Sequence, residues 1–314
     1  MTATRARLDA NRWHLQHGPI DLIIGADGEA TAVHAAHEAC WQRFVGVLDE
    51  LVAELPLLKQ PLPAASVHCP MKGRVANRMW NACYPHRARF ITPMAAVAGS
   101  VADELIEAFA RSGVTRAYIN NGGDIALYLS EGQSYRVGLL ADLAASPGAP
   151  LPGDHAFDAN LTLDASMPVR GVATSGWRGR SFSLGIADSV TVLARNAASA
   201  DAAATIIANA VDVQHDGIVR APAASLKDDS DLGDRLVTVD VPLLPPALID
   251  LALTRGAEEA ERLHAQGLIE GAALFLQRHA RVVGLNPARP VHVPYDLPRA
   301  PYLPEAPCSK YAAY

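Results

Sequence analysis

The chain has 314 residues, half of them hydrophobic, and its 27 basic and 33 acidic residues give a net charge of −6. This length allows one large domain or two small ones. The acidic balance argues against a nucleic-acid partner, because nucleic-acid-binding proteins usually carry a basic stripe. The segment Met1–Gly18 has no apolar run long enough for a signal peptide or a membrane helix. Four cysteines are too few for a disulfide scaffold, so we expect a cytoplasmic protein with no membrane partner.

The spacing of apolar residues predicts one strand and two helices in the first third of the chain. Proline in the first turn and glycine after the last favour the second helix. Small residues crowd its first two turns, where another backbone or a flat ligand could come close. Residues 62–90 show no clean period. The expected elements are a strand at Leu22–Ile24, a helix from Thr31 to about Leu55 closed by Pro56 and Pro61, and a helix from Pro93 to Gly113.

The rest of the chain alternates apolar runs with helical patterns, without strict βαβ order, so we predict an α+β fold in one domain, residues 1–285. Seven prolines after Asn286 exclude helix or sheet interior. Residues 286–314 should therefore form an extended tail that wraps a surface or a neighbouring subunit in a homo-oligomer. The expected strands are Arg116–Asn120, Ile125–Leu129, Tyr135–Leu140, Leu161–Leu163, Val169–Thr174, Ser189–Ala194 and Leu236–Val241. The expected helices are Ser199–Val211, with Ser199 as its N-cap, and one or two alanine-rich helices from Pro246 to about Val283.

The stretch "INNGGDIALYL" carries a turn signal between two apolar runs, which is typical of a hairpin. The bare backbone of Gly122 and Gly123 could also donate N–H groups to an anion. Asp124 could cap the turn or take part in a site. The residues alone leave two interpretations open: a hairpin with no ligand, and a hairpin whose backbone lines a ligand site.

The stretch "GVATSGWRGRSFS" places Thr174, Ser175 and Gly176 at the end of a strand, with Arg178 and Arg180 close by. Hydroxyl, glycine and arginine together are a common phosphate-binding set. The same residues also suit an ordinary surface loop. No G-x-S-x-G nucleophile elbow and no G-x-G-x-x-G dinucleotide fingerprint is present.

Asp201 and Thr205 lie one turn apart on a predicted helix, so their side-chain oxygens face the same way. An acid and a hydroxyl at a helix start could hold a divalent ion such as Mg²⁺, which prefers a few protein oxygens and substrate phosphates. Alternatively, Asp201 only complements the helix dipole and Thr205 packs. The cluster His68, Cys69, Cys83 and His86 has poor spacing for zinc and favours buried thiols and surface imidazoles.

In chain order, "PMAAVAGSVADEL", "NNGGDIAL", "ATSG", "DSVTVLA" and "ADAAAT" resemble the ApbE superfamily, the FAD:protein FMN transferases. The resemblance covers roughly Ala88 to Val211 and is closest to an uncharacterised ApbE-like branch of shorter cytoplasmic proteins. It implies one α+β domain with a T-fold-like core. It also implies an enzyme that binds FAD and Mg²⁺, breaks the pyrophosphate, and passes FMN to a threonine hydroxyl of an acceptor protein.

The resemblance also assigns roles to single positions. Asp201 and Thr205 match the metal-binding residues of that family, with a main-chain carbonyl near Val97 as a third ligand. The flavin-binding positions that match are Gly122, Gly123 and Asp124 in the turn, Thr174, Ser175 and Gly176 in the following motif, and Ala98 and Gly99 at the helix start.

Two departures from the family pattern bear on activity. The family carries a lysine where this chain has Ala98, and a His-x-x-Asp-Pro segment where this chain reads "WRGRSFSLGIAD". Without that histidine, catalysis would fall on the metal, on Arg180, or on Asp188 as a base tuned by burial. Three hypotheses follow: an Mg²⁺-dependent enzyme acting on FAD or a related pyrophosphate, a non-catalytic protein that binds a flavin or another phosphorylated cofactor, and a scaffold with a relic pocket.

Overall fold

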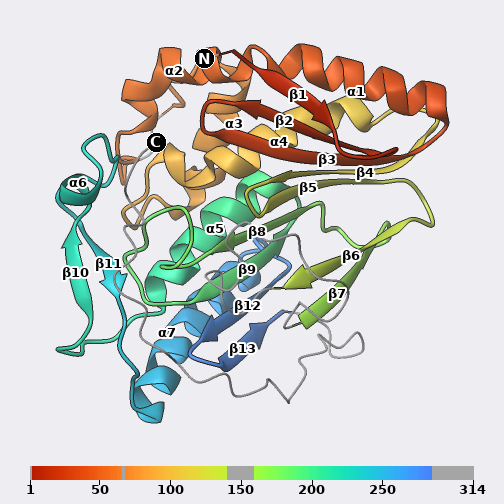
Figure 1. Cartoon of the computed structure of the whole chain (residues 1–314). Helices are drawn as coiled ribbons and strands as arrows, with labels where there is room; N and C mark the ends of the chain where they lie inside the picture. Colours follow the sequence, from red (N-terminus) through yellow and green to blue (C-terminus); the bar gives the residue numbers. More distant parts are fainter. Residues whose placement is uncertain (1, 66–67, 140–158, 285–314) are drawn as a thin grey trace.

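The computed structural model describes residues 2–65, 68–139 and 159–284. A nine-stranded sheet forms its centre, and every neighbouring pair of strands in it is antiparallel (Figure 1). The predicted α+β fold is therefore confirmed. In spatial order the strands are β1 (Thr4–Arg7), β2 (Arg12–His17), β3 (Ile20–Gly28), β4 (Val114–Asn121), β5 (Asp124–Leu129), β8 (Gly171–Ser175), β9 (Ser189–Ala194), β12 (Gly271–Leu276) and β13 (His279–Val283).

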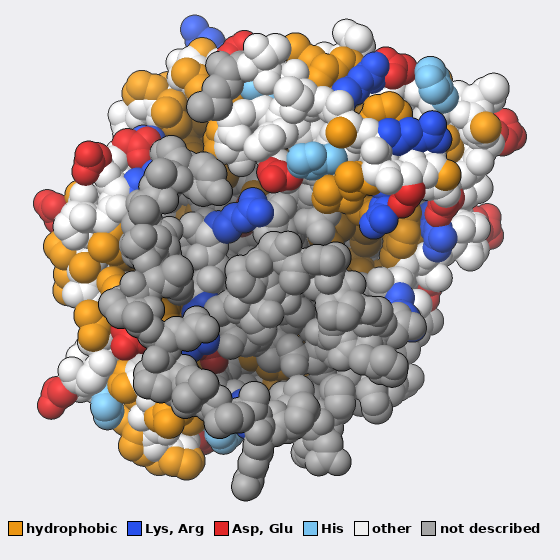
Figure 2. All heavy atoms as spheres, viewed as in Figure 1, with side chains coloured by type: hydrophobic (Ala, Val, Ile, Leu, Met, Phe, Trp, Pro, Cys, Tyr) orange, Lys and Arg blue, Asp and Glu red, His pale blue; other side chains and the backbone are white. Residues whose placement is uncertain are grey.

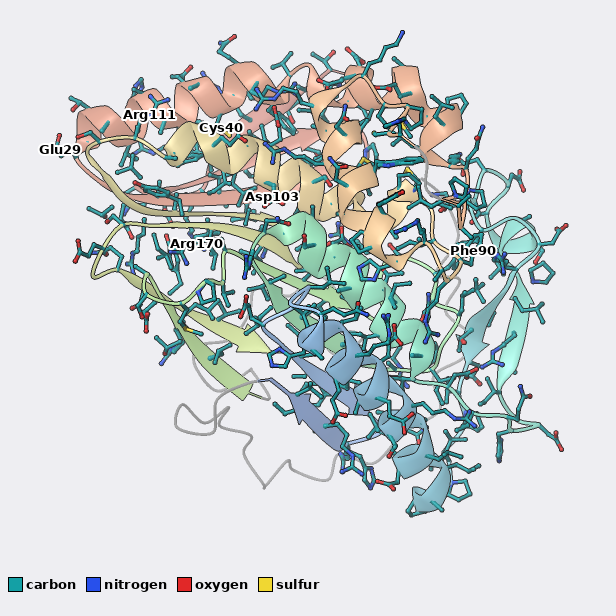
Figure 3. The ribbon with its side chains drawn as sticks, turned by 180° about the vertical axis from the view of Figure 1, so that it is seen from behind. Glu29, Cys40, Phe90, Asp103, Arg111 and Arg170 are labelled. Carbon is teal, nitrogen blue, oxygen red and sulfur yellow. The ribbon has the colours of Figure 1, made fainter. Side chains whose placement is uncertain are left out.

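The main helices lie together on one face of this sheet, as Figures 1 and 3 show from opposite sides. Their buried side chains and those of the sheet form the main hydrophobic core. A short helix, α6 (Ala223–Leu226), follows the ribbon strand β10. The main helices are α1 (Ala30–Phe44), α2 (Val47–Leu58), α3 (Arg74–Cys83), α4 (Val97–Ile106), α5 (Ala197–Ala210) and α7 (Pro246–Ala265), with 3₁₀ turns at Tyr84–His86, Pro93–Ala96 and Glu107–Phe109.

Two separate two-stranded ribbons complete the described structure. β6 (Ser134–Leu139) and β7 (Ala159–Asp164) form one ribbon, and their apolar side chains make a second, smaller core with β8, β9 and β12. β10 (Val219–Pro222) and β11 (Leu236–Asp240) form the other ribbon, at one side of the molecule (Figure 1).

The sheet has a narrow joint in its middle. β5 and β8 pair through only two residue pairs, Ile125 with Val172 and Ala126 with Gly171. On one side of this joint α4 packs on β4 and β5, and on the other side α5 packs on β8 and β9. The two helices also pack on each other. The sequence motifs of interest all come from these elements, so the joint brings them together.

Several expected elements need correction. The helix expected from Thr31 to Leu55 is two helices, because the chain turns at Val45–Gly46, and Pro56 lies inside the last turn of α2, where it does not end the helix. The second alanine-rich helix expected before Val283 is the β12–β13 hairpin. Every residue of β12 is buried, so the run lacks the polar alternation that marks a half-exposed strand.

Other elements were not predicted at all. The β1–β2 hairpin and α3 come from segments without a clear apolar period. The predicted tail, residues 286–314, lies outside the described residues, as does the end of the strand expected at Tyr135–Leu140. Within the part of the chain that the structure describes, no helix is both long enough and apolar enough to cross a bilayer.

Candidate functional site

The turn between β4 and β5 is a two-residue hairpin formed by Gly122 and Gly123. Their φ angles are +67° and +115°, and Asn121 pairs with Asp124 across the turn. Glycine suits both positions because two-residue hairpins of this twist need positive φ. A Cβ on Gly122 would lie 3.2 Å from Nη1 of Arg180, so this guanidinium rests against the turn backbone. The hairpin prediction is confirmed, and it places Arg180 beside the glycines.

The polar residues around these glycines each hold a different element. Asn120 Oδ1 accepts from the Gly123 N–H at 2.8 Å and tightens the turn. The Asn121 side-chain amide donates to the Ala98 carbonyl at the start of α4, at 3.1 Å. Asp124 Oδ1 accepts from the Thr174 N–H near the end of β8, at 3.2 Å. The motif therefore joins the turn to α4 on one side and to β8 on the other.

Asp201 lies in the second turn of α5 and reaches the start of α4. Its Oδ2 accepts from the Gly99 N–H at 3.0 Å. Thr205 follows on the same face of α5, and both side chains are half-buried. The main-chain carbonyl near Val97, predicted as a metal ligand, lies at the first residue of α4, next to Ala98. The residues predicted for the metal and for the helix start thus come from the start of α4 and from the first half and middle of the adjacent helix α5.

The two acids of this region, Asp124 and Asp201, both have raised pKa values. Burial raises the pKa of Asp124 to about 7, and a hydrogen bond from Thr174 opposes that rise. The pKa of Asp201 lies well above its ordinary value because of burial and, next, because of the negative charge of Asp124. In the described part of the chain, no arginine or lysine pairs with either carboxylate. Two carboxylates that repel each other without a counter-charge are suited to a divalent cation.

The Thr174–Gly176 segment lies beside this pair of acids. Thr174 Oγ1 and Thr191 Oγ1 are 2.9 Å apart across β8 and β9. Ser175 is the last residue of β8 and is half-buried. Gly176 is required by packing, because a Cβ there would lie 2.4 Å from the Asp188 carbonyl oxygen. The backbone at Gly176 therefore runs directly against the start of β9.

Comparison with known families adds to this geometry. A family model described as AbpE bacteria matches residues 5–282. The chain belongs to the AbpE bacteria family.

Relatives of this AbpE-family chain carry the name UPF0280 protein. One from Methanothrix thermoacetophila is 33% identical over 192 residues, which cover 60% of this chain and 70% of the relative. One from Methanopyrus kandleri is 34% identical over 191 residues, which cover 60% of this chain and 69% of the relative. A third, from Methanospirillum hungatei, is 39% identical over 124 residues, and the chain spans less than half of its length, 46%.

Two solved structures are also similar to the AbpE-family chain. The apo form of the flavinyl transferase ApbE from Pseudomonas stutzeri has a TM-score of 0.44 and 14% identity, covering 90% of this chain and 93% of that one. The flavin transferase ApbE from Vibrio cholerae, as a histidine-to-glycine mutant, has a TM-score of 0.43 and 12% identity, covering 87% and 97%. At these scores neither structure assigns a role to a residue of this chain.

Asp188 stands where the AbpE-family chain departs from the transferase pattern, and the structure shows its carboxylate fully engaged. Oδ1 accepts from the Trp177 indole N–H at 3.1 Å, and Oδ2 accepts from the Gln277 N–H at 2.6 Å. Arg178 Nε lies 3.7 Å from Oδ1. These contacts tie the loop after β8 to the β12–β13 turn. No sequence motif indicates this role for Trp177 and Gln277, because the two residues lie far apart in the chain and meet only in the fold.

A hollow of about 340 Å³ opens at the other end of α5. Asn209 lines it and continues the stripe of Asp201 and Thr205 along the same helix face. Phe90 lines it too, and the Arg235 guanidinium carbon lies 3.4 Å from the centre of the Phe90 ring. Figure 3 shows Phe90 close to the β10–β11 ribbon.

The cysteines and charges of the described residues indicate no second site. Cys69 Sγ lies 3.3 Å from Asn77 Oδ1, and Cys83 is buried with its Sγ 3.9 Å from the Pro93 carbonyl. No group of three or more His, Cys, Asp or Glu side chains suited to a metal occurs in the described ranges. Acidic and basic side chains are interspersed over the coloured part of the face in Figure 2, without a continuous basic stripe there.

Proposed function

We propose that this AbpE-family protein is an Mg²⁺-dependent enzyme that acts on FAD or a related nucleotide pyrophosphate. It would either transfer FMN to an acceptor protein or hydrolyse FAD to FMN and AMP. The observation that carries the proposal is the pair Asp124 and Asp201, two half-buried carboxyl groups with raised pKa values and no arginine or lysine partner among the described residues.

The donor set fits Mg²⁺, which prefers oxygen ligands. Asp201 and Thr205 of α5, Asp124 of β5 and a main-chain carbonyl near Val97 of α4 would hold the ion. Bound Mg²⁺ would neutralise phosphate charge and polarise the phosphorus atom. Its positive charge would also restore the ionised form of both carboxyl groups, which accounts for why two unpaired acids are kept together.

The other residues supply binding and orientation. The Gly122–Gly123 backbone has no side chain that would shield it from a phosphate, and Arg180 is a second cationic group beside it. Thr174 and Ser175, at the end of β8, could add hydroxyl groups, and the Thr174 N–H donates to Asp124. The hollow at Phe90 and Asn209 has a volume of about 340 Å³, which is enough room for a ring. Asn209 lies about 12 Å along α5 from Asp201, at about 1.5 Å per residue. A nucleotide with its phosphates at the acids could extend along α5.

One observation favours a second function, a carrier that binds the same ligand without turnover. The histidine of the transferase pattern is absent, and both oxygens of Asp188, the candidate base, already accept hydrogen bonds. A carboxylate in that state is poorly placed to accept a proton from a substrate. In that case Asp201 and Thr205 would serve ligand binding alone.

Calorimetric titration of FAD, FMN and ADP into the full chain, with and without Mg²⁺, tests the proposal. Chromatography of the same mixtures detects FMN and AMP. Asp201→Asn is the test variant, and Asp216→Asn is its matched control, because Asp216 is exposed and the change in charge is the same.

We expect FAD binding that needs Mg²⁺, that weakens about tenfold or more in Asp201→Asn, and that is unchanged in Asp216→Asn. Release of AMP establishes the enzyme, and binding without AMP establishes the carrier. If none of the three nucleotides binds the wild-type chain, with or without Mg²⁺, both functions are wrong.

A further inference from the structure

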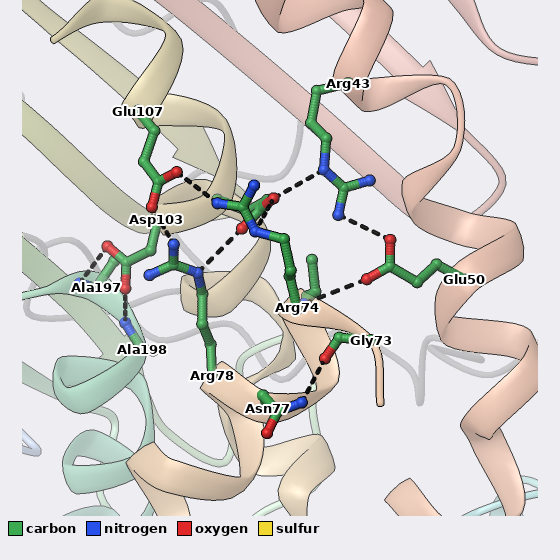
Figure 4. A network of polar contacts seen from close by, with 12 residues as sticks. Arg43, Glu50, Gly73, Arg74, Asn77, Arg78, Asp103, Glu107, Ala197 and Ala198 are labelled. Carbon is green, nitrogen blue, oxygen red and sulfur yellow. Dashed lines mark hydrogen bonds and ion pairs between the residues drawn. The ribbon is translucent and has the colours of Figure 1, made fainter. Parts of the chain in front are cut away.

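The first amides of α5 all donate within the chain. The Ala197 and Ala198 N–H groups donate to Oδ1 and Oδ2 of Asp103, at 2.9 and 2.8 Å (Figure 4). The Ser199 N–H donates to Asn196 Oδ1 at 2.8 Å. Amides in the first turn of a helix have no partner inside that helix and need one from outside. Asp103, which belongs to α4, provides it for two of them and adds a negative charge at the positive end of α5.

Asp201 of α5 accepts in the same way from amides in the first turn of α4. It accepts from the Gly99 N–H at 3.0 Å, and the Ala98 amide also hydrogen-bonds to it. Asp103 follows Gly99 by one helical turn, just as Asp201 follows Ala197. Each helix therefore contributes one aspartate that caps the start of the other.

The two helix starts touch at their backbones. A Cβ on Gly99 would lie 2.3 Å from the Ala197 carbonyl oxygen and 2.8 Å from the Ala198 nitrogen. A glycine is needed here for the close approach, and it explains the small residues at the start of α4. With the backbones in contact, a change in the first turn of α5 moves Asp201 relative to α4 directly.

The next residue, Glu104, fixes α4 from its other side. Its carboxylate accepts from Arg43 Nε at 2.8 Å and from Arg78 Nε at 3.1 Å, and Arg74 Nε lies 3.3 Å away (Figure 4). These arginines come from α1 and α3, so they anchor α4 to the rest of the helical layer. Asp103 therefore extends toward α5 from a helix whose next residue forms ion pairs with α1 and α3.

We infer that Asp103 is a positioning residue for the cation site. By holding the first turn of α5 against α4, it fixes the carboxylate of Asp201 so that Asp201 and Asp124 face one divalent cation. Both oxygens of Asp103 accept from the amides of α5, and its negative charge also contributes to the raised pKa of Asp201. This inference rests on the proposed function, since it concerns the same acids.

Binding of Mn²⁺, an oxygen-binding ion that serves as a spectroscopic substitute for Mg²⁺, tests the inference on the full chain without any nucleotide. Free Mn²⁺ is measured by electron paramagnetic resonance during titration of the wild type, Asp103→Ala, Asp103→Asn and Glu104→Gln. Glu104→Gln is the matched control: Glu104 is the neighbouring buried acid on the same helix, but it faces the arginines. Circular dichroism establishes the temperature range in which each variant is folded.

We expect the Mn²⁺ dissociation constant to rise about tenfold in Asp103→Ala, and less in Asp103→Asn, which keeps one acceptor oxygen for an α5 amide. Glu104→Gln should be less stable but bind Mn²⁺ as the wild type does. If Asp103→Ala does not fold, Asp103→Asn alone decides.

Wild-type affinity in the folded Asp103 variants would overturn the inference and leave the proposed function intact. Equal weakening in Glu104→Gln would also overturn it, because general loosening would then be the cause. A wild-type chain that binds no Mn²⁺ contradicts the proposed function first, and the positioning role with it.

Discussion

Asp103 and Asp201 occupy matching positions in two crossing helices, but their surroundings differ. Each accepts hydrogen bonds from first-turn amides of the other helix. Asp103 is buried, with both oxygens used and the positive charge of Arg78 nearby. Asp201 is half-buried and faces Asp124, a like charge. The same capping geometry is thus satisfied at Asp103, whereas Asp201 and Asp124 are left with raised pKa values and no basic partner among the described residues. Acids whose pKa values are perturbed in this way are typical of a ligand site.

The largest expected effect comes from breaking both caps at once. Gly99→Ala would force a methyl group into main-chain atoms of α5, so the helices must separate and both caps must lengthen. We expect a loss of about 3 kcal/mol in the free energy of unfolding, measured by urea denaturation. Gly46→Ala is the control, because no atom lies within 4 Å of its Cβ position, and it should cost less than about 1 kcal/mol. Equal losses in the two variants would show that the helix contact does not limit stability.

The second prediction separates Asp103 from its neighbour Glu104 by pH. Burial raises the pKa of Asp103 from 3.8 to about 6, although the amides of Ala198 and Ala197 oppose the rise. Its contribution to stability is therefore full below pH 3.8 and is lost as the pH rises through about 6. For Glu104, burial is outweighed by hydrogen bonds from Arg43 and Arg78, which hold its pKa below the ordinary 4.5. Its contribution is present above pH 4.5 and is lost as the pH falls.

Asp103→Asn and Glu104→Gln should therefore change the slope of the free energy of unfolding against pH in opposite directions. Between pH 6 and pH 4, the wild type should gain stability relative to Asp103→Asn, by up to about 3 kcal/mol for a shift of this size. Over the same range it should lose stability relative to Glu104→Gln. Urea denaturation at a series of pH values measures both differences. Slope changes of the same sign would mean that the amides, and not burial, determine the direction of the pKa shift of Asp103.

The sequence was sufficient for the elements around the joint and insufficient for the contacts between them. β4, β5, β9 and α5 were predicted because short apolar runs are bounded by clear turn signals. β12 was not, because a strand buried on both faces has the same composition as a buried helix. Asp201 and Asp124 were candidates from the spacing and turn chemistry of their own segments, and the motif resemblance then assigned each of them a predicted role. Asp103 was not found, because its spacing from Gly99 gains meaning only once α4 and α5 are known to cross.

The smallest expected effect tests the local cap of α5 against the distant one. The sequence predicted Ser199 as the N-cap, but in the structure Asn196 is the cap and Ser199 supplies the amide that it accepts. Asn196→Ala should cost about 1 kcal/mol, while Ser199→Ala should change stability by less than about 0.5 kcal/mol. Asn196→Ser, which keeps an acceptor, is the control. Thermal denaturation of the three variants decides between the assignments: a larger loss in Ser199→Ala would restore Ser199 as the cap. With Asn196 as the cap, its side chain serves only the third amide of α5, and the first two amides depend on Asp103.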